Sequence, residues 1–233
     1  SLIKGDSINL SAGRDIALTS TSASERYSNT WGTYVSGVSR IDAGSLNVQA
    51  GRDLTLTAAQ VAARDDARLQ AGRDVTLNTL SVSHGERIVR DARNRYELST
   101  SREIGATVAA GGNLTIAAGQ DVSARAADVT AGKQLAVGAG RDISATAGVQ
   151  TQDSYIESYY KQRGFLSSRS NHMINSIKTE RAQATTFTGD TAVLVAGRDV
   201  NVAGSNGGAP PEPAVPGGRG GENTAGGESR GAH

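Results

Sequence analysis

The stretch Ala12-Gly13-Arg14-Asp15-Ile16 recurs along this chain, and its recurrence decides the fold. Glycine, a polar residue, aspartate and an aliphatic residue return in this order, beginning at Gly51, Gly72, Gly119, Gly140 and Gly197. Two of the intervals between these glycines are 21 residues, and the others are 38, 47 and 57 residues, which is one period plus an addition. A fixed repeat that tolerates insertions is typical of a solenoid, in which each repeat buries its apolar face on its neighbours.

Apolar and polar side chains alternate after each Gly-Arg-Asp marker. Ile16 and Leu18 follow the first marker, and Leu54 and Leu56 follow the second. A second glycine usually lies eight residues before the marker, as Gly5 does, and opens another run of the same spacing. A spacing of two predicts strands with one buried face, three to each 21-residue unit. The sequence therefore predicts an all-β fold, a parallel β-helix of about six coils and about 29 Å in length.

The markers are expected to stack as corners along a rod that runs from about residue 3 to residue 203. Glycine allows a positive φ at a corner, and the aspartate two residues later can cap the turn. We expect a structural turn ladder of Gly13, Asp15, Gly51, Asp53, Gly72, Asp74, Gly119, Asp121, Gly140, Asp142, Gly197 and Asp199. Stacked aspartates repel one another, and the adjacent arginines can neutralise them. A metal or anion site is the alternative, but the denser Gly-Gly-x-Gly-x-Asp repeat of calcium-binding β-rolls is missing.

Composition limits the possible functions. The 233 residues include no cysteine, so a disulfide framework and a cysteine-based metal site are excluded. The 24 basic and 23 acidic residues give a net charge of +1, which removes the usual electrostatic case for a nucleic-acid partner. No apolar run approaches the roughly 18 residues of a transmembrane segment. His84, His172 and His233 lack metal-ligand spacing, so we expect neither a metal nor a cofactor.

Residues 204–233 differ from the repeats. They contain ten glycines and all four prolines of the chain, and they show no strand pattern. Such a segment cannot bury enough apolar surface to offset the cost of ordering. We therefore expect a β-helical rod at 1–203 to be followed by a disordered tail at 204–233.

Three additions interrupt the repeats at about residues 19–40, 79–105 and 147–188. Each follows a strand after a Gly-Arg-Asp marker, so all should leave the rod at the same corner as projecting β-hairpins. All nine aromatic residues of the chain fall within these three ranges. A candidate contact surface consists of Trp31, Tyr34, Tyr155, Tyr159, Tyr160 and Phe165. The alternative is that stacked hairpins form a side sheet that buries most of these rings.

The Ala-Gly-x-Asp-aliphatic-x-aliphatic repeats and the alternating long and short units resemble the haemagglutinin repeats of filamentous haemagglutinin-like exoproteins. This family includes adhesins and the large effectors of contact-dependent growth inhibition. The stretch KQRGFLSS at residues 161–168, followed after a polar arm by 191–200 and 203–205, is similar to the carboxy-proximal repeat type of the family. The resemblance covers about residues 1–205.

The resemblance implies a right-handed parallel β-helix that is exported by two-partner secretion through an outer-membrane transporter. Export recognition would lie in an amino-terminal domain that is not among these residues. The resemblance also implies an elongated stalk, secreted to the outer cell surface of a Gram-negative bacterium, with a target-cell envelope or a host surface as partner. Adhesion and toxin delivery both remain open.

Two classes of function compete at this point. The first is a structural and interaction stalk, and the second is a β-helical polysaccharide-degrading enzyme. An enzyme of that kind needs unlike acidic and basic groups that converge outside the repeat pattern. The remaining candidates, Asp65 and Asp66, are neighbours along the chain and should point to opposite faces of a strand. The sequence therefore favours a protein that is not an enzyme.

Overall fold

The structure is a computed structural model, and it describes residues 1–164, 168–204 and 206–208. The elements of this part of the chain are all β-strands, and no helix occurs in it. The strands form two parallel sheets and one antiparallel sheet. The prediction of an all-β fold that is built on parallel strands is therefore confirmed.

The parallel strands surround one interior on three sides, which we call faces A, B and C. Face A contains β7 (Gln60–Ala63), β12 (Thr107–Ala110), β15 (Asp128–Ala131), β20 (Thr186–Thr188) and β23 (Asn206–Gly208). Face B contains β8 (Ala67–Ala71), β13 (Leu114–Ala118), β16 (Gln134–Ala139) and β21 (Thr191–Ala196). The long strands β1 (Leu2–Ala12) and β5 (Arg40–Ala50) contribute to both faces, because β5 pairs first with β7 and then with β8.

Face C is made of the strands that follow the Gly-Arg-Asp markers. They stack in chain order as β2 (Ile16–Thr19), β6 (Leu54–Thr57), β9 (Val75–Asn78), β14 (Val122–Arg125), β17 (Ile143–Thr146) and β22 (Val200–Ala203). Equivalent residues of successive repeats lie side by side, as Leu54 does with Val75. The sequence repeat therefore sets the register in which these strands pair.

The interior is filled by the alternate apolar residues of the three faces. Leu54, Leu114 and Ile143 are fully buried, and many of their neighbours are alanine, which suits a narrow interior. The first aliphatic residue is buried in the four central marker strands, as expected, and Ile16 of the first strand packs against the same core. Burial falls at the last coil, because Val200 has a neighbouring marker strand on one side only and remains 36% exposed.

The corner glycines do not serve the expected purpose. Among the glycines of the described residues only Gly204 has a positive φ, so the left-handed conformation is not what the markers require. Instead the corners approach one another closely, and a Cβ on Gly72 would collide with the carbonyl oxygen of Gly51. The positive φ values belong to two alanines, Ala58 at 48° and Ala126 at 46°, at corners of the units without an addition.

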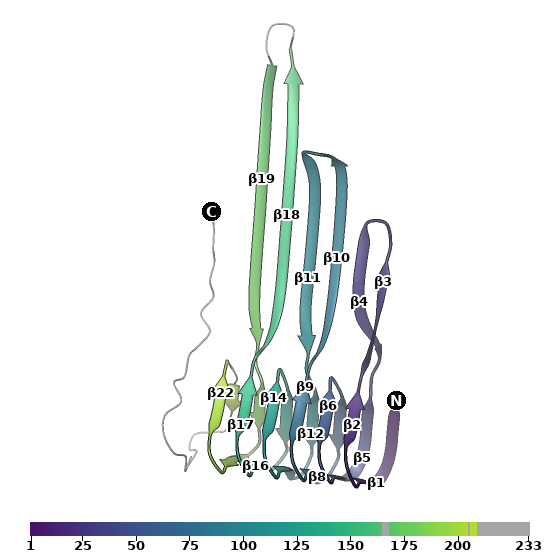
Figure 1. Cartoon of the computed structure of the whole chain (residues 1–233), viewed down its shortest axis with the longest axis vertical. Coiled ribbons are helices and arrows are strands. Elements are labelled where there is room, and N and C mark those ends of the chain that lie inside the picture. Colours follow the sequence, from purple (N-terminus) through teal and green to yellow (C-terminus); the bar gives the residue numbers. More distant parts are fainter. Residues whose placement is uncertain (165–167, 205, 209–233) are drawn as a thin grey trace.

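Three antiparallel strand pairs rise from one side of the coils, and Figure 1 shows that their length increases along the chain. We call them hairpin 1, with β3 (Thr21–Arg26) and β4 (Thr30–Gly37), hairpin 2, with β10 (Leu80–Asp91) and β11 (Asn94–Ile104), and hairpin 3, with β18 (Gly148–Arg163) and β19 (Ser168–Gln183). Together they form one six-stranded sheet, the hairpin sheet, in the order β19-β18-β11-β10-β4-β3.

Two boundaries differ from the sequence analysis. Phe187 lies in β20 beside Val129 and is 3% exposed, so it belongs to the coil interior and not to the third addition. The coils therefore do contain an aromatic residue. Strand β23 pairs with β20 inside the segment expected to be a tail, so coil structure extends to Gly208. The rest of that segment, 209–233, lies outside the described residues.

Candidate contact surface

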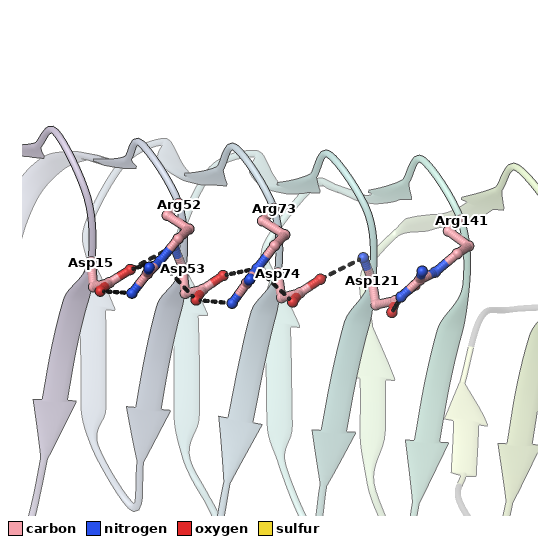
Figure 2. A network of polar contacts seen from close by, with 7 residues as sticks. All are labelled: Asp15, Arg52, Asp53, Arg73, Asp74, Asp121 and Arg141. Atoms are coloured by element: carbon pink, nitrogen blue, oxygen red, sulfur yellow. Dashed lines mark hydrogen bonds and ion pairs between the residues drawn. The ribbon is translucent and has the colours of Figure 1, made fainter.

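The Asp and Arg side chains of the markers connect neighbouring coils. Each arginine reaches back to the aspartate of the preceding marker, so that Arg52 Nε donates to Asp15 Oδ1 at 2.8 Å. The same contact joins Arg73 to Asp53, Arg141 to Asp121 and Arg198 to Asp142. Figure 2 shows several of these side chains following one another along the corners. The contacts are the intercoil neutralisation that stacked carboxylates require.

These Asp and Arg side chains form a column along the corners, which we call the corner column, and the column has one break. Gln120 stands where an arginine would reach Asp74. Asp74 keeps two contacts of a kind that other corners also have, from the backbone N–H of Asp121 at 3.2 Å and from the Nε of its own neighbour Arg73 at 3.2 Å. Where the arginine is present it favours the ionised carboxylate. Its hydrogen bond lowers the pKa of Asp15, Asp121 and Asp142 below the usual value. These carboxylates are engaged by guanidinium groups, and the described residues hold no cluster of metal-binding side chains.

The hairpin sheet has two solvent-facing sides, because successive side chains of a strand point to opposite sides. We name them the Glu157 side and the Ile156 side. The strand registers place Trp31, Tyr155 and Tyr159 on the Glu157 side, whereas Tyr34 and Tyr160 lie on the Ile156 side. Phe165 lies outside the described residues. The structure therefore does not bring the sequence-predicted rings together on one surface.

Tyr155 lies in a polar cluster around Glu157, and the ring of Tyr159 packs edge-on against His172 of this cluster, with ring centres 5.9 Å apart. This carboxylate accepts hydrogen bonds from His172 Nε2 at 2.9 Å, Arg95 Nε at 2.7 Å and the Tyr155 hydroxyl at 3.1 Å. The guanidinium of Arg95 lies 4.8 Å from the ring centre of Tyr155. The hydrogen bond from His172, with those from Tyr155 and Arg95, lowers the pKa of Glu157 although the side chain is only 8% exposed. The cluster joins β11, β18 and β19, so both tyrosines serve first to bind strands together.

Trp31 also has a structural contact. Its indole lies over Gly85 of β10, where any Cβ would overlap the ring. On the other side of the sheet, His84 lies near Gly32, with its Nδ1 at 3.7 Å from a Cβ built on that glycine. Each ring thus covers the glycine of the facing strand, and the two pairs fix the register of β4 against β10.

Buried polar groups attach the hairpins to the coils. Glu103 at the base of hairpin 2 accepts hydrogen bonds from Arg125 of β14 and from the backbone N–H of Val149 in hairpin 3, the latter at 2.7 Å. The hydroxyl of Ser20 donates to the carbonyl of Ala58 at 2.7 Å, and that of Thr185 donates to the carbonyl of Thr146 at 2.6 Å. Because these groups are buried or half-buried, their hydrogen bonds resist rotation of the hairpins about their bases.

Exposed apolar side chains gather on the outer part of the Ile156 side. They are Ile88 at 42% exposure, Ile156 at 37%, Tyr160 at 63%, Met173 at 53% and Ile177 at 55%. The registers of β10, β11, β18 and β19 place them on the same side. The contact surface predicted from the sequence contains only aromatic residues. Alternation along the hairpin arms is the signal that places the aliphatic Ile156 on the same side as Tyr160.

Asp65 and Asp66, the carboxylates considered for an enzyme, lie at the corner between β7 and β8 and not on a strand as expected. Asp66 Oδ1 accepts the backbone N–H of Asn113 at 2.7 Å and its side-chain amide at 3.1 Å, which caps the next corner. The backbone N–H of Asp65 donates to the carbonyl of Gly44. Within the described ranges no helix has the length and apolar character needed to cross a membrane.

Residues 22–84 and 92–209 match the model of the hemagglutinin repeat family. The chain belongs to this family. It is also similar to the 16S rRNA endonuclease CdiA of Enterobacter cloacae subsp. cloacae, with 35% identity over 149 residues, or 64% of this chain. The match spans only 4% of the length of that relative. No solved structure matches the chain. The family resemblance inferred from the repeats is thereby confirmed.

Proposed function

We propose that this hemagglutinin-repeat chain is a structural and interaction segment of a secreted, filamentous haemagglutinin-like protein at the surface of a Gram-negative bacterium. In this proposal the three faces are those of a right-handed parallel β-helix of about six coils, which provides a rigid support. The hairpins project from it and contact a partner. One observation carries the proposal, namely that hairpins from three separate parts of the chain form a single sheet that stands away from the coils (Figure 1).

The partner in this proposal is the envelope of a target cell or a host surface. The exposed apolar side chains on the outer Ile156 side, such as Ile177 and Met173, support a contact role. Contiguous exposed apolar side chains are typical of interaction sites, where binding of a partner removes them from water. An outer-membrane two-partner-secretion transporter would bring the whole protein to the cell surface. Similarity to CdiA favours contact-dependent growth inhibition as the setting, and adhesion is the other setting that the family offers.

The chain itself is proposed to be neither an enzyme nor a cofactor-binding protein. The carboxylates of the corner column are engaged by arginines of neighbouring coils, as Asp53 is by Arg73. Asp66 is engaged in the cap of a corner. No observation on the described residues favours the polysaccharide-degrading alternative, which would need carboxylates free to act on a glycosidic bond.

Shortening hairpin 3 tests the proposal. Residues 156–175 are replaced by an Asn-Gly turn that joins Tyr155 to Ser176, which already face each other across the two strands. The variant should fold with a melting temperature close to that of the original chain, because the coil core is untouched. Its binding to outer-membrane preparations of Gram-negative cells should fall by at least about tenfold, or about 1.4 kcal/mol.

A variant that ends at Gly208 is the control, and it should bind as the original chain does. Equal binding by the shortened and original chains would reduce the hairpins to side packing and the segment to a spacer. A shortened chain that no longer folds would show that the hairpin sheet belongs to the core of the fold, which also contradicts the proposed division between support and contact.

A further inference from the structure

The two edges of the hairpin sheet differ. Strand β19 forms one edge and is paired with β18 on one side only, over 16 residues and without a register shift. It is about 54 Å long at 3.4 Å per residue. The opposite edge, β3, has six residues and a register shift between Thr21 and Ser22. In the described part of the chain the sheet therefore has one short, irregular edge and one long, regular edge (Figure 1).

An edge strand presents unpaired N–H and C=O groups to which another strand can add. Proteins usually block such an edge with proline, a bulge or closely spaced charges. Strand β19 contains no proline and no glycine, and residues 170–177 contain no Lys, Arg, Asp or Glu. This uninterrupted, uncharged stretch is suited to accept an extended chain by backbone pairing.

The side chains of β19 are also uncovered. All those described from residue 169 to residue 183 are exposed except Thr179, which is half-buried. Met173 and Ile177 are 53% and 55% exposed on one side of the sheet, and Ile174 is 57% exposed on the other. A strand added to this edge would cover apolar side chains on both sides of the sheet, whereas a partner on one side of the sheet would cover only part of them.

The charges of β19 select the partner. The strand carries three cations, Arg169, Lys178 and Arg181, and one carboxylate, Glu180, which gives a net charge of 3 − 1 = +2 with His172 neutral. Among the described residues these three cations form no ion pair and no side-chain hydrogen bond. The neighbouring strands differ in this respect, because Arg95 is paired with Glu157 and Arg87 with Glu97.

A second copy of the chain fits this edge poorly. Antiparallel pairing of two β19 strands through residues 170–177 would bring Arg169 of each copy beside Lys178 of the other. Like charges facing each other across a strand pair are destabilising. A strand with carboxylates before and after an uncharged centre would instead meet both cations favourably, so charge complementarity favours an acidic partner.

We propose that β19 binds an extended acidic polypeptide strand, which pairs with its backbone along residues 170–177 and places carboxylates near Arg169 and Lys178. The proposal rests on the proposed role of the hairpin sheet as the contact surface, and it adds the chemical class of the partner. Specificity comes from the two flanking cations, and the apolar contacts to Met173, Ile174 and Ile177 add to the backbone pairing.

A synthetic peptide tests the proposal on the whole chain. The probe has two glutamates at each end of a central Thr-Val repeat, and the control probes have lysines at the ends or prolines in the centre. Binding is measured by fluorescence anisotropy. The Arg169→Glu/Lys178→Glu variant should bind the glutamate probe at least about tenfold more weakly than the original chain. The matched Lys161→Glu/Arg163→Glu variant, with the same change of charge on β18, should bind within about twofold of the original.

Amide hydrogen exchange reports the mode of binding. The glutamate probe should protect alternate amides of residues 170–177, since only every second N–H of an edge strand points outward. Equal loss in both variants, binding of the proline probe or absence of protection would overturn the proposal. Self-association through β19, or binding of anionic phospholipid vesicles without binding of the peptide, would also overturn it.

The test separates this inference from the proposed function. If envelope binding is lost on shortening hairpin 3 but persists in Arg169→Glu/Lys178→Glu, the hairpin sheet is the contact surface and its partner is not an acidic strand. That result would reject the inference and keep the function.

Discussion

At the scale of single residues, the corner column shows how a sequence repeat places opposite charges beside each other in neighbouring coils. Each bidentate contact joins the arginine of one marker to the aspartate of the preceding marker, as in Arg52 and Asp15. Both side chains are about 40% exposed, so a single pair adds little to stability. The column matters because removing the arginines would leave stacked carboxylates about 4.8 Å apart. The arginine of the next marker thus offsets this repulsion at the corners where it occurs, and Asp74 is a corner at which Gln120 replaces it.

The break beside Asp74 yields a prediction at this scale. Gln120→Arg places a guanidinium where the backbone already matches the other corners, since Gln120 N–H donates to the carbonyl of Arg73 at 2.7 Å as its counterparts do. The variant should be more stable by about 0.5 kcal/mol, which is an increase of about 1–2 °C in melting temperature.

Gln120→Lys is the control for this prediction. It should gain less, because lysine cannot form the bidentate contact. The gain of Gln120→Arg should shrink in high salt. Thermal melts that show no gain, or an equal gain for lysine and arginine, would contradict the view of the column as a set of bidentate pairs.

At the scale of elements, the hairpins are held to one another by few specific contacts. Hairpins 2 and 3 share the Glu157 cluster, and hairpins 1 and 2 share the two ring–glycine pairs. The Glu157 cluster joins three strands near the turn of hairpin 2, whereas Trp31 and Gly85 join only β4 and β10. Hairpin 1 therefore depends on a single small region of contact with the rest of the sheet.

Gly85→Ala tests that dependence. The added methyl group overlaps the indole of Trp31, so the ring must leave or the strands must separate. Pairing of hairpin 1 should weaken by about 1–3 kcal/mol, seen as faster amide exchange in β3 and β4 with an unchanged melt of the coils. Gly32→Ala should have a smaller effect, because the new methyl group would lie 3.3 Å from the carbonyl oxygen of Ser83 and 3.7 Å from His84 Nδ1, whereas the methyl group on Gly85 would overlap the indole.

A double mutant checks the cause. If the clash with Trp31 is responsible, Trp31→Ala together with Gly85→Ala should exchange no faster than Trp31→Ala alone. Additive effects of the two substitutions would show that Gly85 is needed for another reason.

The coils could be predicted from the sequence because each marker fixes both position and side. Ile16 and Leu54 stand in the same place after the same three residues, and they pair in the structure. The arms of the hairpins contain no such marker, and their Ser- and Thr-rich pattern is compatible with many registers. Tyr34 and Tyr160 were therefore grouped with Trp31, which the pairing places on the opposite side.

Other features could not be predicted from the alternation of apolar and polar residues. Phe187 lies between two threonines at the end of a polar arm and resembles hairpin sequence, yet the three residues of β20 pair with β15 and bury it. Ala58 and Ala126 have a positive φ at corners where the chain turns without an added hairpin. Alanine rarely adopts this conformation, so the sequence does not predict it.

At the scale of the whole molecule, the coils and the hairpin sheet are two separate parts of the structure. Among the described residues, the buried apolar cluster lies within the coils and includes no residue of the hairpin sheet. Because Glu103 links hairpin 2 to a coil and to hairpin 3, the sheet is attached to the coils at more than one point. The proposed contact function rests on one claim, namely that hairpins distant in sequence form one continuous sheet.

Disulfide formation between hairpins 2 and 3 measures that claim directly, and the natural absence of cysteine makes the measurement clean. Leu98 faces Ser154, and Ser99 faces Asp153, across β11 and β18. Cysteines are placed at either pair, and Leu98→Cys with Ser158→Cys is the control that is out of register. After mild oxidation, mass spectrometry should find an intramolecular disulfide in at least one of the two facing pairs and none in the control. Disulfides only between molecules, or equal disulfide formation in the control, would contradict a single hairpin sheet.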